Sequence, residues 1–122
     1  MVVTEDIGPT LAQNNIAAAG VPVNDISIVA TKAGHTLLLA RVIFSNVTAN
    51  TMIAMWIKRN AGGLAASGIY MQLVGAATLM TLFGGASIPD AVIGDVFTIM
   101  VSSSDSTADI AAGQAALTTV TA

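Results

Sequence analysis

The chain has 122 residues, enough for one domain with a single core. Apolar residues make up 54% of it and charged residues only 9%, whereas an ordinary globular domain has about 25% charged residues. The four Lys and Arg residues form no basic cluster and the net charge is −3, which argues against a nucleic-acid partner. Cysteine is absent, which excludes disulfides, thiolate catalysis and cysteine-based zinc sites.

Residues 1–25 differ from the rest of the chain. Two prolines, an Asn pair and the lack of a period of 2 or 3.6 residues indicate an extended N-terminal arm. Glu5 and Asp6 stand where a secretory signal would carry basic residues, so no signal peptide is expected. We therefore predict two parts, an arm over 1–25 and a folded domain over 26–122.

From residue 26 onward, short β-type runs alternate with turn signals at Gly, Asn and Ser. The predicted strands are 26–30, 36–46, 50–60, 68–74, 78–83, 96–101 and 110–121. No gap between them is long enough for a helix, which argues against a parallel α/β sheet. The pattern predicts an all-β fold, an antiparallel β-sandwich of the jelly-roll kind with about seven strands.

The predicted strand over 36–46 shows the clearest alternation. One face carries Leu37, Leu39, Arg41 and Ile43, and the other carries Leu38, Ala40, Val42 and Phe44. Because Arg41 is charged, its face is predicted to be the wetter one. The aromatic residues expected in the sandwich core are Phe44, Trp56, Phe83 and Phe97.

The segment 60–89, "NAGGLAASGIYMQLVGAATLMTLFGGASIP", contains no charged side chain and is long enough to cross a membrane. Its apolar runs are short, however, and Gly, Ser, Gln and Thr interrupt them. We predict two strands, 68–74 and 78–83, joined by a short turn, and no membrane span. A loop is expected to follow over 84–95, because this segment holds Pro89 and a Gly-Asp pair.

Several predicted strands are apolar on both faces. In a small sandwich of two sheets, one face of each sheet should meet water. An apolar outer face therefore predicts contact with a second subunit, and hence an oligomer.

Candidate catalytic and metal-binding residues are few. His35 is the only histidine and lies in a predicted turn, where a surface position is expected. Asp90 and Asp95 flank a turn, and Asp105 and Asp109 belong to a polar loop that lacks the ligand count of a calcium loop. No nucleophile motif accompanies them. We therefore predict no catalytic, cofactor-binding or metal site and no enzymatic activity, while an ion or receptor at the polar loop stays open.

Four segments carry a resemblance to a known family. They are "AGHT" (33–36), "LLLARVIFSN" (37–46), "MIAMWIKRNAGG" (52–63) and "IGDVFTIMVSSSD" (93–105). In this order of strands and turns, the chain from about residue 28 to 121 resembles a β-sandwich module of tailed-bacteriophage virions. The motifs are turns and alternation, not catalytic residues.

The resemblance implies a structural virion protein, foremost a capsid decoration (cement) protein that binds the outer shell and stabilises capsomer junctions. It further implies a homotrimer, the major capsid protein as partner, and a place on the capsid surface after synthesis in the host cytoplasm. A tail, connector or head-fibre/receptor-binding component of the same fold is the alternative. The interface residues expected are Val2, Val3, Ile7, Pro9 and Leu11 in the arm, and Met71, Leu73 and Leu79 in the charge-free strands.

Overall fold

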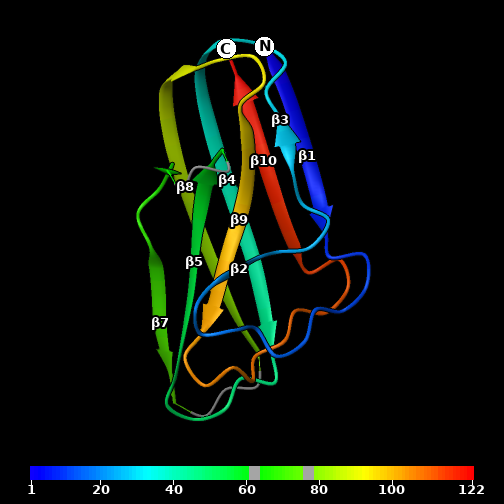
Figure 1. The fold of residues 1–122 in the computed structure, drawn as a ribbon, viewed down its shortest axis with the longest axis vertical. Helices are drawn as coiled ribbons and strands as arrows, with labels where there is room; N and C mark the ends of the chain where they lie inside the picture. The colour runs from blue at the N-terminus through cyan, green and yellow to red at the C-terminus, as the bar shows by residue number, and fades with distance from the viewer. Residues whose placement is uncertain (61–63, 76–78) are drawn as a thin grey trace.

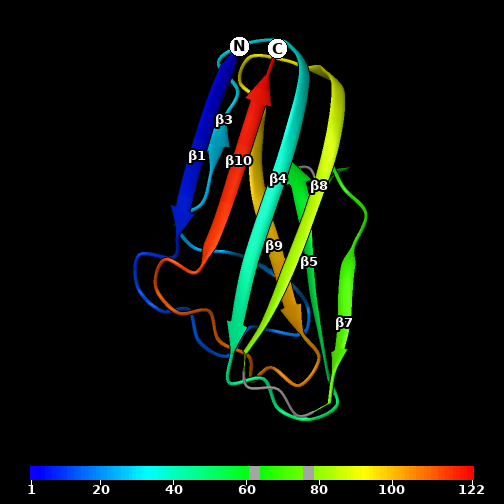
Figure 2. The same cartoon turned by 180° about the vertical axis from the view of Figure 1, so that it is seen from behind.

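The computed structural model describes residues 1–60, 64–75 and 79–122, with backbone alone at 64 and 65. In these segments the chain forms two antiparallel sheets packed face to face, with both termini at the same end (Figures 1 and 2). The predicted all-β antiparallel sandwich is confirmed. The described segments hold no long apolar helix of the kind that crosses a membrane.

The first sheet, here called sheet I, has the strand order β1-β10-β4-β8. Its strands are β1 (Val2–Gly8), β10 (Ala115–Thr121), β4 (Gly34–Ser45) and β8 (Leu79–Ala91). The central strand β4 pairs with β10 on one side and with β8 on the other (Figure 2). Sheet I therefore consists of strands that are at least seven residues long.

The second sheet, sheet II, is built around the pair of β5 (Thr51–Arg59) and β9 (Val96–Ser103). On the side of β9 away from β5 lie two short strands, β2 (Val21–Pro22) and β3 (Ile28–Val29). The strands β6 (Leu64–Ala65) and β7 (Tyr70–Val74) flank β5. Sheet II faces the viewer in Figure 1.

The core lies between the two sheets and follows the predicted alternation. The inward residues of β4 are fully or almost fully buried, namely Leu38, Ala40, Val42 and Phe44. Opposite them lie Ile53, Met55 and Ile57 of β5 and Phe97, Ile99 and Val101 of β9. Each large side chain buried here contributes about 1.5–3 kcal/mol to folding, so this layer supplies most of the cohesion between the sheets.

Residues 1–25 are part of the sandwich and do not form a separate arm, which corrects the predicted division of the chain. β1 pairs with β10 along its whole length, from Val2 with Thr121 to Gly8 with Ala115. Further along, Ile16 and Val23 are buried in the core. The prediction missed this because the segment holds one strand of seven residues followed by irregular chain, which shows no sustained period.

The loop predicted over 84–95 is also corrected, since β8 continues to Ala91. Gly84, Gly85 and Pro89 are tolerated because β8 is the edge strand of sheet I, where a missing N–H or side chain costs little. Near Pro89 the register shifts, as Thr36 pairs with Ile88 whereas Gly34 pairs with Ala91. The actual loop is confined to residues 92–95.

The charge-free stretch crosses from one sheet to the other. Of its two predicted strands, the first is β7 in sheet II and the second is the start of β8 in sheet I. Tyr70 connects β7 of sheet II to β8 of sheet I. Its hydroxyl donates to the carbonyl of Gly85 (2.6 Å) and accepts from the N–H of Gly85 (3.0 Å). The glycines at 62 and 63 and the predicted start of the second strand at residue 78 lie outside the described residues.

Candidate interaction surfaces

The outward residues of sheet I form a surface, here called the sheet I outer face, that is mostly apolar. Cross-strand neighbours make rows across the four strands, of which Val3, Val120, Leu37 and Ser87 form one. The next two rows are Glu5, Thr118, Leu39 and Gly85, and Ile7, Ala116, Arg41 and Phe83. Val3, Ile7, Leu37 and Leu39 are each about half exposed, and Phe83 is 68% exposed. The prediction that Phe83 lies in the core is therefore wrong, because it occupies an outward position of β8.

Arg41 and Glu5 are the only charged residues in those three rows. The Nε of Arg41 is buried among its neighbours and has no hydrogen-bond partner among the described residues. A buried donor that lacks an acceptor costs about 1–3 kcal/mol. Arg41 as a whole is only half-buried, so this face offers apolar contact area together with a cationic group.

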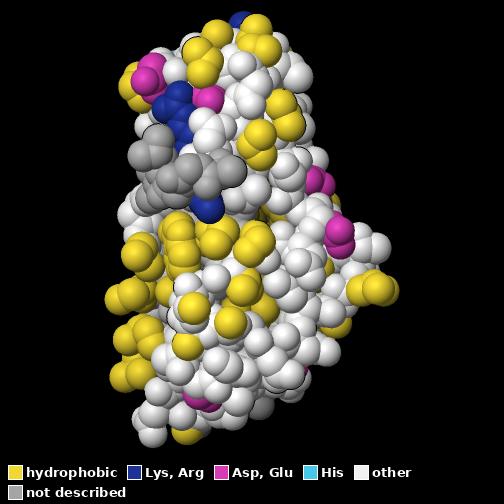
Figure 3. All heavy atoms as spheres, viewed as in Figure 1, with side chains coloured by type: hydrophobic (Ala, Val, Ile, Leu, Met, Phe, Trp, Pro, Cys, Tyr) yellow, Lys and Arg dark blue, Asp and Glu magenta, His cyan; other side chains and the backbone are white. Residues whose placement is uncertain are grey.

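The outward residues of sheet II form a second apolar surface, the sheet II outer face. Met52 pairs with Leu73 and Trp56 with Met100 across neighbouring strands, and Met71 lies beside Ala54. Met71 and Leu73 on β7 are each 60% exposed. Figure 3 shows hydrophobic side chains gathered over the β7 and β5 part of this face, with Lys and Arg side chains only above them.

A groove of about 290 Å³ opens on the sheet II outer face. Its lining residues come from β2, the end of β5 and β9, and are Pro22, Lys58, Asn60, Val96, Thr98 and Met100. Thr98 pairs with Lys58, and Met100 pairs with both Trp56 and Pro22. The small Thr98 side chain thus lies among larger neighbours within this groove.

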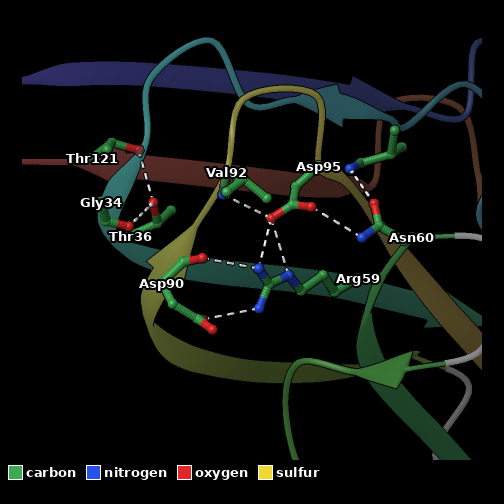
Figure 4. A network of polar contacts seen from close by, with 9 residues as sticks. Gly34, Thr36, Arg59, Asn60, Asp90, Val92, Asp95 and Thr121 are labelled. Atoms are coloured by element: carbon green, nitrogen blue, oxygen red, sulfur yellow. Dashed lines mark hydrogen bonds and ion pairs between the residues drawn. The ribbon is translucent and has the colours of Figure 1, made fainter.

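An ionic network fixes the end of β5 (Figure 4). Arg59 contacts the carboxylates of Asp95 (2.8 Å) and Asp90 (3.0 Å), and Asn60 donates to Asp95 (3.0 Å). The pKa of Asp95 is lowered, first by the N–H of Val92, then by Asn60 and Arg59. The pKa of Arg59 is raised, first by its hydrogen bond to Asp90 and then by that to Asp95. These contacts bind the loop before β9 to the end of β5.

A second carboxylate holds the other end of β5. Asp105, just beyond β9, accepts hydrogen bonds from the hydroxyls of Thr48 and Thr51. Its pKa is lowered well below the ordinary carboxyl range by Thr48 first, then by Thr51 and Thr107. Asp95 and Asp105 therefore clamp the β5–β9 pair at both ends.

The polar loop after β9 is tied to its neighbours. Asp109 accepts from the side chain of Asn46 (2.6 Å) and the N–H of Asn15 (2.8 Å). Among the residues that the structure describes, no group of three His, Asp or Glu is arranged to hold a metal ion. The aspartates of this loop thus have structural partners within the chain.

The predicted interface residues do not share one surface. Val3 and Ile7 lie together on the sheet I outer face, and Leu79 is exposed at the start of β8. Met71 and Leu73 lie together on the sheet II outer face. Val2 is half-buried, Pro9 is buried, and Leu11 is exposed in the loop after β1.

The predicted interface residues did not include Leu37, Leu39, Phe83, Trp56 and Lys58, although Leu37 and Leu39 were expected on the wetter face of their strand. For Leu37 and Leu39 the signal was present, since strict alternation already placed them opposite the core. The prediction that Trp56 lies in the core is also wrong, because Trp56 is half-buried on the outward side of β5 and pairs there with Met100. For Phe83, the deciding information was the register of β8 beside β4.

Comparisons of the sequence with family models and with curated proteins find no match. Solved structures do match. Murine APRIL, a TNF-family protein, superposes with a TM-score of 0.69 at pH 8.0 and 0.68 at pH 5.0, with 98% of both chains covered and 11% and 13% identity. The fold is a jelly roll. A chain of infectious bursal disease virus, Gx strain, superposes with a TM-score of 0.61 and 15% identity.

APRIL and the viral chain differ in the share of their own length that this chain matches. The chain matches APRIL over its whole length, whereas it covers 31% of the viral chain while 97% of its own length is used. The identities are so low that the likeness concerns the fold alone. Function therefore has to be argued from the surfaces described above.

Proposed function

We propose that this chain is a structural protein of a virus particle, without enzymatic activity, that acts by burying apolar outer faces against other subunits. The observation that carries the proposal is the composition of the sheet I outer face. Large apolar side chains are exposed there in three successive rows, and Glu5 and Arg41 are the only charges in those rows. Soluble monomers rarely expose a contiguous apolar surface of this kind.

The subunits that cover this face are further copies of the chain, in a homotrimer. Leu37, Leu39 and Phe83 supply the apolar contacts, and Val3 and Ile7 extend them onto β1. An acceptor on the neighbouring copy pairs with the exposed part of the Arg41 guanidinium group. The N-terminal segment thus takes part as a strand of the buried face and not as a free arm.

The finer proposal is a capsid decoration protein whose partner is the major capsid protein. The exposed strip of Met71 and Leu73 on β7 remains for contact with the shell once sheet I is covered by self-association. The protein is then made in the host cytoplasm and lies on the capsid surface of the virion. The resemblance to phage sandwich modules and the fold shared with a viral chain support this placement. A tail, connector or head-fibre/receptor-binding component would use the same two faces.

The first prediction concerns self-association. Light scattering behind gel filtration should give three times the chain mass of 12.3 kDa for the unmodified protein. Leu39→Lys places a second positive charge two residues from Arg41 on the sheet I outer face and should give a monomer. The matched control, Leu73→Lys on the sheet II outer face, should leave the trimer intact. A monomeric unmodified protein, or a trimer lost only in Leu73→Lys, would contradict the assignment.

The role on the particle is tested by cosedimentation with particles of the encoding virus prepared without this chain. The unmodified protein should bind their heads, and Leu73→Lys should bind at least tenfold more weakly while staying trimeric. Binding to isolated tails and not to heads would favour the alternative. Truncation of residues 1–20 is unsuitable as a test, because it removes β1 and the core residue Ile16.

A further inference from the structure

The groove on the sheet II outer face differs in chemistry from the strip on β7. Val96, Met100 and Pro22 line it with apolar side chains, and Lys58 and Thr98, each of which carries a polar group, line it as well. The side chain of Asn60 is already engaged, because it donates to Asp95 and accepts from the N–H of Val96. The groove therefore combines apolar walls with two polar groups from neighbouring positions of β5 and β9.

Lys58 has no ion-pair partner among the described residues, where the ion pairs all involve Arg59. The undescribed segments are Ala-Gly-Gly and Ala-Ala-Thr and contain no acid. All seven Asp and Glu residues thus lie in the described part, and none of them neutralises this ammonium group. Thr98, paired with Lys58 across the strands, makes no side-chain hydrogen bond to another described residue.

The size of the groove limits what it can hold. Its volume of about 290 Å³ lies near the lower end of the ~300–1,000 Å³ range of ligand sites. At ~30 Å³ per water molecule, it equals roughly ten waters, so the ligand has roughly ten non-hydrogen atoms. A lone cation beside an apolar wall is complemented by an anion that carries an apolar body.

We propose that this groove binds a small apolar carboxylate, with the carboxylate on Lys58 and Thr98 and the aliphatic part against Val96, Met100 and Pro22. Lys58 donates to one carboxylate oxygen and the Thr98 hydroxyl donates to the other. The net charge of −3 opposes the approach of any anion, so binding requires the aliphatic contacts as well as the ion pair. This site is independent of the virion role, because it uses neither β7 nor sheet I.

Trp56 provides a readout at the end of the groove. It pairs with the lining residue Met100 and packs over Gly20, which lies two residues before Pro22. A Cβ at Gly20 would come within 2.8 Å of the indole, so the ring has little freedom at this place. Because it is the only tryptophan in the chain, its fluorescence reports on this region alone.

The test titrates the full-length protein with octanoate, which has ten non-hydrogen atoms, below its micelle-forming concentration. Trp56 fluorescence and backbone amide NMR shifts are both followed, so that a silent fluorophore does not hide binding. Octylamine tests the head group, since it keeps the chain and reverses the charge, and acetate tests the body, since it keeps only the carboxylate. Lys58→Met removes the charge but keeps the stem, and Lys32→Met is the matched control at an exposed lysine outside the groove.

We expect saturable binding of octanoate, with amide shifts centred on Thr98, and no saturable binding of octylamine or acetate. Lys58→Met should weaken octanoate at least about tenfold, since it removes a charge-assisted hydrogen bond. Lys32→Met should bind octanoate unchanged. Equal binding of octanoate and octylamine, equal affinity of Lys58→Met, or no shift in either readout would overturn the proposal.

Discussion

The two outer faces of the sandwich are both apolar, yet they differ in relief. On sheet I, the rows that cross the long strands β1, β10, β4 and β8 expose large apolar side chains, such as Val3, Leu39 and Phe83. On sheet II, the small Thr98 lies among Lys58, Met100 and Pro22 within a groove. The same alternation thus produces an extended contact surface on one sheet and a hollow on the other.

The largest expected difference is in the free energy of unfolding, between substitutions in the core and substitutions on the sheet I outer face above it. Leu38→Ala should lower the free energy of unfolding by about 2–5 kcal/mol, because Leu38 is fully buried between the sheets. Leu39→Ala, one residue along the same strand, should cost about 0.5 kcal/mol or less in dilute monomeric protein, since its side chain faces outward. Urea unfolding at low protein concentration measures both. Equal losses would show that the outer face is part of the core.

A smaller effect should appear where the edges of the two sheets meet. A Cβ at Gly84 would lie 2.3 Å from the ring of Tyr70, so Gly84→Ala must displace the side chain that bridges β7 and β8. We expect a loss of about 1–3 kcal/mol in urea unfolding. The control is Gly75→Ala, where a Cβ meets no atom of the described residues within 4 Å. If the two variants were equally stable, Tyr70 would not hold the edges together.

The smallest effect is expected on acidification, which should destabilise the β5–β9 pair of sheet II before it affects sheet I. The folded-state pKa values of Asp95 and Asp105 are lowered from the ordinary value of 3.8, so both carboxylates stabilise the β5–β9 pair above that pH. This contribution should decrease as the pH falls below about 4 and continue to decrease towards the lowered pKa values. Amide exchange should then accelerate at the ends of β5 before it does in β4.

Asp95→Asn and Asp105→Asn provide the check on that acid response. Each should already be less stable than the unmodified protein at pH 7 and should lose less stability on acidification. An unchanged pH profile in both variants would show that other carboxylates cause the acid response.

The sandwich and its core could be predicted from the sequence because they depend on local alternation. The inward set of β4 from Leu38 to Phe44 matches the prediction residue for residue. The failures occurred where the pattern was short or broken. β1 has only seven residues, and β8 runs through two glycines and a proline that usually mark a loop.

The candidate surfaces were less predictable. The predicted strand 68–74 already implied that Met71 and Leu73 face the same way, whereas no alternation was recognised around Val3 and Ile7. Alternation carried no information on which strands lie side by side, so the rows that join Ile7 to Arg41 and Phe83 could not be foreseen. Phe83 was placed in the core because a large aromatic residue usually lies there, whereas the register of β8 turns it outward.

The sequence by itself determined the all-β class, the inward face of the longest strand and the scarcity of charge, because each depends on residues near one another in the chain. Only the tertiary structure decided that residues 1–25 complete the sandwich, that Asp95 and Asp105 clamp β5 from both ends, and that Lys58 stands without a carboxylate beside an apolar groove. Those features depend on pairing between distant segments. Such pairing is decided by burial of the whole core and not by any local pattern.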